Sequence, residues 1–203
     1  MTMPSSVLKA FQFFNESNGA NIMTEKLYVV DQEIQRDKSE FVSSDVFREA
    51  MSRLSAPVAL VTTDGPAGRY GLTVSAICSV SVEPPTVLVC LNRDNRSHAA
   101  FLRNGVIGIS ILEPGHEELA FRFASSKTDQ NEKFLGADWV ERLGGAPVLA
   151  NAAVTLVGRI AQTLSSGSHD ILVAHIHDIG LHTENTKGLV WFDRAFHHLP
   201  AQT

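Results

Sequence analysis

The sequence predicts a mainly β fold, a barrel or sandwich with flanking helices, in one principal domain. Its apolar runs are short and separated by glycine, proline and polar turn signals, which is typical of antiparallel sheets rather than parallel ones. A chain of 203 residues with 44% hydrophobic content can bury one good-sized core. We expect the domain to span residues 44–203. Residues 1–43 are interpreted as a partly flexible N-terminal extension, because the segment 26–40 is charged and has few side chains to bury.

Charge and cysteine usage limit the possible partners and the compartment. The formal net charge is -5 and no stripe of lysine and arginine occurs, so nucleic acid and anionic membrane surfaces are poor partners. No apolar run approaches the ~20 residues that span a bilayer, and the N-terminus lacks the pattern of a secretory signal. The two cysteines, Cys78 and Cys90, fall in apparent strands without C-x-x-C spacing, which favours reduced thiols. We therefore expect a cytoplasmic protein without membrane or nucleic-acid partners.

The stretch from Gly71 to Ser97 carries the strongest signals. Residues 71–82 alternate with period two, so a single strand there would have one apolar and one hydroxyl-rich face. The turn at 83–85 leads to a second strand, 86–91, which is apolar at nearly every position and is expected to be buried on both sides. The chain leaves that strand through the polar segment 92–98, which is rich in hydrogen-bond donors and opens a helix. Such donors suit an anion.

The remaining elements follow from periodicity and turn residues. A helix beginning at Ser44 or Asp45 has Val46, Phe47, Ala50, Met51 and Leu54 on one face and is ended by Pro57. Further strands are expected at 58–63, 106–112, from 147, at 154–164, at 169–179 and, as one closing strand, at 188–198; helices are expected at 98–103, closed by Asn104-Gly105, and from Pro114, with a polar loop at 125–145.

The same central stretch resembles a known family. The pattern G-x-T-V-S-x-x-x-S-V-S-x-x-P-P-x-x-L-V-C-L-N-R is similar to the core of the short-chain flavin reductases, and the similarity extends from about Phe47 to about Leu199. These are NAD(P)H-dependent reductase components of two-component monooxygenases. The resemblance implies an FMN-binding split β-barrel, a Greek-key-like antiparallel barrel, that forms a homodimer.

The resemblance also assigns cofactor-binding residues to positions that composition alone would leave as a solvated strand face and a capped helix start. It implies that the backbone and hydroxyls of a four-residue segment bind the flavin ring edge, that donors of the following segment bind the flavin phosphate, and that one aromatic residue near the C-terminus lies close to the cofactor. In chain order these are Thr73, Val74, Ser75 and Ala76 for the ring, Asn92, Arg93, Asn95, Arg96 and Ser97 for the phosphate, and Phe196.

His169 is the catalytic candidate. Gly167-Ser168-His169 stands where the family has a Gly-Asp-His motif, whose histidine lies near the nicotinamide and the flavin. Here Ser168 replaces the aspartate, although Asp170 follows immediately, so what fixes the orientation of the ring is open. His175 and His177 lie on one face of a strand, but no third ligand is spaced for a metal, and we expect none.

No Ser/His/Asp triad and no pair of carboxylates for acid–base catalysis stands out, and hydride transfer between nicotinamide and flavin does not need one. The resemblance therefore predicts that NADH or NADPH reduces FMN or FAD and that the reduced flavin passes to an oxygenase partner. Two alternatives remain open at this point: a tightly bound FMN enzyme acting on another small substrate, and a non-catalytic flavin-binding module.

Overall fold

The computed structural model describes residues 41–142, 144–182 and 187–201. The expected N-terminal extension, 1–43, lies almost entirely outside the described residues and stays a prediction. The helices are α2 (Ser44–Ser52), α3 (His98–Asn104), α4 (Glu117–Ala124) and α5 (Gln130–Lys133). The strands are β1 (Ala56–Pro57), β2 (Ala59–Thr63), β3 (Tyr70–Val74), β4 (Ile77–Val82), β5 (Pro85–Asn92), β6 (Val106–Ile111), β7 (Trp139–Glu141), β8 (Pro147–Leu149), β9 (Val154–Ser166), β10 (His169–Leu181), β11 (Gly188–Phe192) and β12 (Ala195–Leu199).

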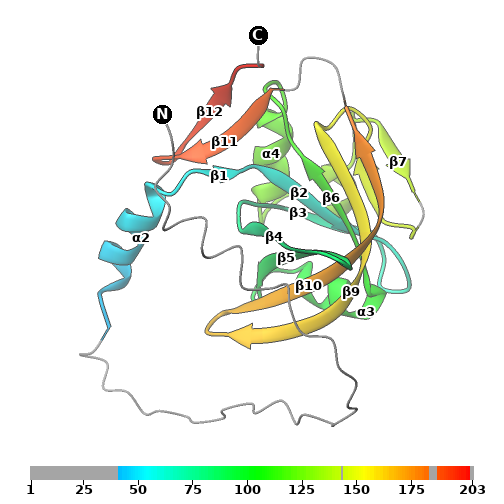
Figure 1. Cartoon of the computed structure of the whole chain (residues 1–203), viewed down its shortest axis with the longest axis horizontal. Helices are drawn as coiled ribbons and strands as arrows, with labels where there is room; N and C mark the ends of the chain where they lie inside the picture. Colours follow the sequence, from blue (N-terminus) through cyan, green and yellow to red (C-terminus); the bar gives the residue numbers. More distant parts are fainter. Residues whose placement is uncertain (1–40, 143, 183–186, 202–203) are drawn as a thin grey trace, which may run out of the picture. The chain divides into compact units, whose positions relative to one another are not determined.

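The expectation of a mainly β fold with flanking helices is confirmed. Seven strands form one sheet in the order β3-β2-β6-β9-β10-β5-β4, and every pairing in it is antiparallel (Figure 1). A three-stranded sheet, β1-β11-β12, and a two-stranded sheet, β7-β8, complete the described β structure. No described helix is long and apolar enough to span a membrane.

The two edge strands of the large sheet, β3 and β4, are consecutive in the chain. Only Ser75 and Ala76 separate them, so the Cα atoms of Val74 and Ile77 are at most about 11 Å apart. The sheet must therefore curl until its two edges approach each other. No hydrogen-bonded ladder joins β3 to β4 in the part of the chain that the structure describes, so a seam remains between the edges.

The break at Ser75-Ala76 corrects the expectation of one strand over residues 71–82. β3 pairs with β2, whereas β4 pairs with β5 at the opposite end of the sheet. A shift in register between Ser79 and Ser81 adds a second irregularity. As a result the expected apolar face is buried only at Val74, while Val82 is 89% exposed.

Strand β2 separates two hydrophobic clusters. Ala59 and Val61 pack into the cluster enclosed by the curled sheet and closed by Phe101 of α3. Leu60 points the other way, into a cluster with Phe123 of α4 and residues of β8 and β11. Burial on both faces accounts for the continuous apolar run in this strand. Because α4 packs on β2 and β3, its end is held beside the seam.

Three expectations about the flanking elements change in detail. The closing strand at 188–198 is a hairpin, since Asp193 and Arg194 take positive φ angles and turn the chain between β11 and β12. The loop at 125–145 contains helix α5 and strand β7. The apolar face of α2 is exposed rather than buried, with Phe47 55% and Met51 45% accessible to solvent.

Candidate functional site

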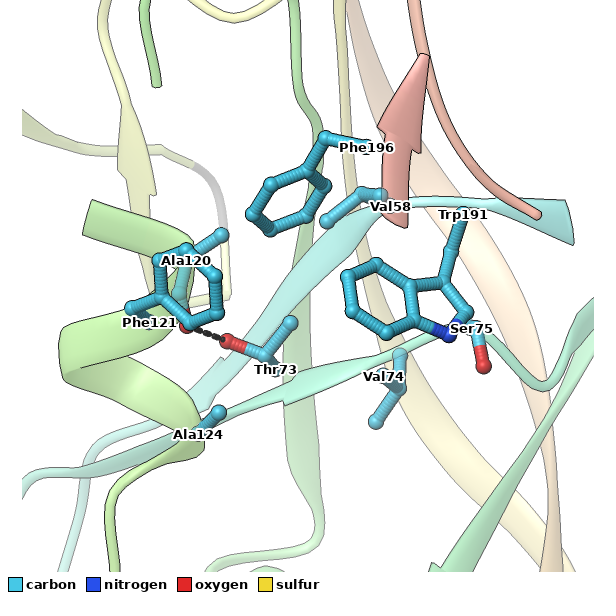
Figure 2. Close-up of a pocket in the computed structure, with 9 residues that line it drawn as sticks. All are labelled: Val58, Thr73, Val74, Ser75, Ala120, Phe121, Ala124, Trp191 and Phe196. Atoms are coloured by element: carbon cyan, nitrogen blue, oxygen red, sulfur yellow. Dashed lines mark hydrogen bonds between the residues drawn. The ribbon is translucent and has the colours of Figure 1, made fainter. Parts of the chain in front are cut away.

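A cavity of about 190 Å3 lies where strand β3 reaches the seam (Figure 2). Three elements line it: the end of β3, helix α4, and the small sheet that carries two aromatic rings. Its residues are Val58, Thr73, Val74, Ser75, Ala120, Phe121, Ala124, Trp191 and Phe196. Four of the predicted cofactor-binding residues therefore border one cavity: Thr73 and Val74 of β3, Ser75 directly after it, and Phe196.

Aromatic rings form one side of this first cavity. The ring of Phe196 meets Trp191 edge-on, with centroids 5.0 Å apart, and meets Phe121 at 4.9 Å. Such edge-to-face contacts orient the three rings without filling the space between them and β3 (Figure 2). The cavity is thus apolar on this side and suits a planar aromatic group.

The hydroxyl of Thr73 already donates a hydrogen bond. Its Oγ1 lies 2.6 Å from the carbonyl oxygen of Ala120 in α4, which ties β3 to that helix. A hydroxyl has one proton, so toward a ligand Thr73 can act only as an acceptor. Ser75 is exposed at the cavity wall. Ala76 does not line the cavity, and its carbonyl accepts a hydrogen bond from the backbone N–H of Cys90.

A second cavity, of about 220 Å3, is lined in part by the residues that directly follow helix α4. It is polar and is formed by the segment after β5, the residues after α4, and helix α5. Its residues are Asn92, Asp94, Asn95, Arg96, Ser125, Ser126, Gln130 and Lys133. Ala124 lines the first cavity and Ser125 the second, so both cavities border the C-terminal end of α4.

Two cations meet at this second cavity. Lys133 is only 3% exposed, and its Nζ donates to the carbonyl oxygen of Phe123 at 2.8 Å. Burial, together with the positive charge of Arg96, lowers the pKa of Lys133 from 10.5 to about 8. Arg96 itself donates to the carbonyl oxygen of Thr128 at 2.6 Å. Two cations that repel each other in a polar cavity are a favourable setting for a bound anion.

The hydroxyl of Ser97 supports the same interpretation. Ser97 is fully buried, and its Oγ has no hydrogen-bond partner within the described residues. It does not cap helix α3, contrary to the capping role that the sequence suggests. Leaving a buried hydroxyl unpaired costs free energy, so a ligand that accepts its proton gains a hydrogen bond without breaking one within the protein.

Besides Ala76 and Ser97, two further predicted site residues line neither cavity, Arg93 and His169. Arg93 turns toward the β9–β10 hairpin, where its guanidinium donates to the carbonyl oxygen of Gly167 and its backbone N–H to that of Ser168. His169 is exposed at the start of β10, opposite Asn92 in β5, and its Nδ1 lies 2.9 Å from Ser168 Oγ. His169 therefore borders the strand end that leads to the second cavity.

Sequence reasoning missed several lining residues, above all Lys133, Ser125 and Gln130. Lys133 sits in a polar stretch where a lysine is ordinarily solvated, and no local pattern marks it as buried. Of the described residues, no group of three or more His, Cys, Asp or Glu side chains could hold a metal ion.

An apolar, aromatic-lined cavity that adjoins a cationic one suits a planar aromatic molecule with a phosphate ester. The unpaired Ser97 hydroxyl and the Lys133–Arg96 pair are the features that suit the phosphate of such a molecule.

Comparison with known proteins agrees with this geometry. Residues 51–200 match the family described as "Flavin reductase like domain". The FMN reductase (NADH) RutF of Pseudomonas syringae pv. syringae (strain B728a) is 44% identical over 162 residues, which cover 80% of this chain and 90% of that protein. The 4-hydroxyphenylacetate 3-monooxygenase reductase component of Pseudomonas aeruginosa (strain PAO1) is 42% identical over 154 residues, covering 75% of this chain and 90% of that protein.

A solved structure has the same fold. The NADH:FAD oxidoreductase SgcE6 of Streptomyces globisporus C-1027, in complex with NAD and FAD fragments, superposes with a TM-score of 0.70 at 27% identity, covering 77% of this chain and 94% of that one. Matched over three quarters of its length, and with a cavity pair suited to a flavin nucleotide, this chain belongs to the flavin reductase-like family.

Proposed function

We propose that this protein is an NADH-dependent flavin reductase that reduces FMN and supplies it to a partner monooxygenase. The observation that carries the proposal is the pair of cavities at the end of α4, one aromatic-lined and one cationic. The names of the two curated relatives support FMN, NADH and an oxygenase partner.

The ring of the flavin would lie in the first cavity, beside Thr73, Val74 and Ser75. Thr73 would accept a hydrogen bond there, because its proton is committed to Ala120. Phe196 and Trp191 would cover the ring and exclude water. Ala76 is proposed only to keep the backbone of the seam close, since its small side chain does not reach the cavity.

The phosphate would lie in the second cavity, held by Arg96 and Lys133. The unpaired hydroxyl of Ser97, which follows Arg96 but does not line that cavity, would be a further donor from behind it. Asn92 and Asn95 shape the loop, since their side-chain oxygens accept backbone N–H groups of that loop at 2.9 Å. Of the two candidate arginines, Arg96 is the one that borders this cavity. Arg93 would act on the loop rather than on the phosphate.

His169 remains the candidate for the nicotinamide side. A bound flavin would supply the hydride acceptor, and transfer from the nicotinamide would need stacking rather than an acid–base pair. The imidazole of His169 would orient the dinucleotide, with Ser168 in contact with its Nδ1.

We further infer that the curled sheet is an FMN-binding split β-barrel, for which the seam between β3 and β4 is the support. A homodimer would cover apolar side chains that the described domain leaves exposed, such as Val80 and Val82 on β4. Both cysteines are free, which supports a reducing compartment such as the cytoplasm.

The proposal is tested by NADH and NADPH oxidation by purified protein, with and without added FMN or FAD, in air. We expect NADH oxidation that scales with added FMN. If the protein binds FMN but oxidises neither NADH nor NADPH, the reductase hypothesis is refuted and the hypothesis of a non-catalytic flavin-binding module remains. FMN that stays bound through gel filtration, with turnover independent of added flavin, would instead indicate an enzyme with a resident cofactor.

A further inference from the structure

A buried carboxylate, Asp170, joins two loops that border the proposed site. It lies in strand β10 directly after His169 and is 4% exposed. Its Oδ2 lies 2.7 Å from Nε2 of His98, and its Oδ1 accepts a hydrogen bond from Ser165 Oγ at 2.7 Å. The guanidinium of Arg93 lies 3.9 Å from Oδ1.

These contacts fix both ends of the segment 92–98, which we call the phosphate loop. Its start is attached to the β9–β10 turn through Arg93, which donates to the carbonyl oxygens of Gly167 and Ser168. Its end is attached to the same hairpin through His98 and Asp170. Between these two anchors lie Arg96 and Ser97, which are proposed to bind the phosphate.

Asp170 does not border the phosphate cavity, and its two carboxylate oxygens are engaged by His98 and Ser165. Within the loop, the backbone N–H of His98 donates to the carbonyl oxygen of Asn95 at 2.9 Å, and the backbone N–H of Ser97 donates to Asn95 Oδ1 at 2.9 Å. A displacement of the His98 ring would therefore be passed to Ser97 and its neighbours through short, directional bonds.

We propose that Asp170 is a positioning residue for flavin phosphate binding, acting through His98 to hold the phosphate loop on the β9–β10 hairpin. The inference rests on the proposed function. The ionised carboxylate can only accept hydrogen bonds, so the imidazole must present its Nε2 proton to it. The neighbouring His169 side chain leaves the strand on the opposite face, so Asp170 also anchors the strand residue from which that imidazole projects.

The sign of one mutation separates positioning from simple electrostatics. Asp170→Asn removes a negative charge near a proposed anion site, so Coulomb attraction alone would leave FMN affinity unchanged or raise it. Positioning predicts the opposite, a fall of about tenfold, which is the loss of one hydrogen bond to a charged group. The matched control is Asp45→Asn, which removes the same charge from an exposed residue that lines neither cavity and is expected to leave FMN affinity unchanged.

The experiment measures dissociation constants of FMN and of riboflavin, which lacks the phosphate, by quenching of flavin fluorescence in the full-length protein. We expect Asp170→Asn and His98→Leu each to weaken FMN by about tenfold while riboflavin changes by less than about threefold. His98→Gln should restore FMN affinity, because its amide N–H can still donate to Asp170. The double variant Asp170→Asn/His98→Leu should be no weaker than either single variant.

Equal losses for FMN and riboflavin, or an FMN affinity that Asp170→Asn leaves unchanged or improves, would overturn the inference. Thermal unfolding of every variant shows whether it folds. If Asp170→Asn does not fold, the difference in FMN affinity between His98→Gln and His98→Leu tests the proposal instead. If the wild type binds no flavin at all, the proposed function fails, which is a different outcome from wild-type binding without the expected discrimination.

Discussion

Replacing Lys133 with methionine should affect the free energy of unfolding and the affinity for FMN very differently. Burial brings the pKa of Lys133 from 10.5 to about 8, so keeping the ammonium charged at pH 7 costs the ligand-free fold at most about 3 kcal/mol. Methionine removes this cost but leaves the carbonyl oxygen of Phe123 without its donor, which costs about 1–3 kcal/mol. Because the two effects oppose each other, we expect the stability of the ligand-free variant to lie within about 2 kcal/mol of the wild type.

Ligand binding should respond far more strongly than stability. A hydrogen bond between the ammonium and a phosphate contributes about 1.5–3 kcal/mol, so Lys133→Met should weaken FMN about 10- to 100-fold. Riboflavin has no phosphate and should lose less than about threefold.

The assay is fluorescence titration of both flavins at pH 7, accompanied by urea unfolding of the ligand-free proteins. Lys127→Met, which neutralises an exposed lysine that lines neither cavity, is the matched control and should change neither affinity. If FMN and riboflavin weaken equally in Lys133→Met, or FMN does not weaken, Lys133 does not meet the phosphate and the reasoning is wrong.

Three further predictions use the same measurements. Above pH 8 Lys133 is neutral in the ligand-free protein and FMN must restore its proton, so FMN affinity relative to riboflavin should fall by up to about tenfold per pH unit up to pH 9; a constant ratio contradicts this. Ala124→Phe places a ring in the first cavity and should lower the affinity for both FMN and riboflavin by at least about tenfold. A loss of affinity for FMN alone would mean that the flavin ring binds elsewhere. Gly158→Ala puts a methyl group against the carbonyl oxygen of His175, far inside van der Waals contact, and should cost at least about 2 kcal/mol in urea unfolding; an unchanged unfolding midpoint would mean that β9 and β10 pair differently.

Local signals predicted the elements whose boundaries are set locally. Helix α3 ends at Asn104 because Gly105 takes a left-handed conformation, φ 67°, that glycine adopts freely. The long hairpin of β9 and β10 was readable because Gly167, with φ 55°, sits in its turn between two alternating segments. These features depend on residues close together in the sequence, so they could be found without tertiary information.

The break after Val74 could not be found in this way. The alternation from 71 to 82 continues through Ser75 and Ala76 without a proline or glycine, and only the separate pairing of β3 and β4 with distant strands divides it. The exposure of Val82 follows from the same long-range arrangement.

The candidate site could be predicted only in part, because long-range contacts place some of its residues. The positions of Thr73, Ser75 and Phe196 followed from the resemblance, and the structure brings these three together at one cavity. The burial of Lys133 depends on α5 packing beside β3, and the turn of Arg93 away from the second cavity depends on the hairpin opposite. Both are tertiary facts that a local pattern does not contain.

The short link between β3 and β4 also bears on solubility during and after folding. An edge strand normally offers a row of free N–H and C=O groups on which another chain can add a strand, and this is a common start of aggregation. Here the two edges of a seven-stranded sheet are drawn toward each other by a two-residue connection, so each hinders access to the other. Lengthening this connection would release both edges at once. We therefore expect its shortness to protect the protein against misassembly, independently of any ligand.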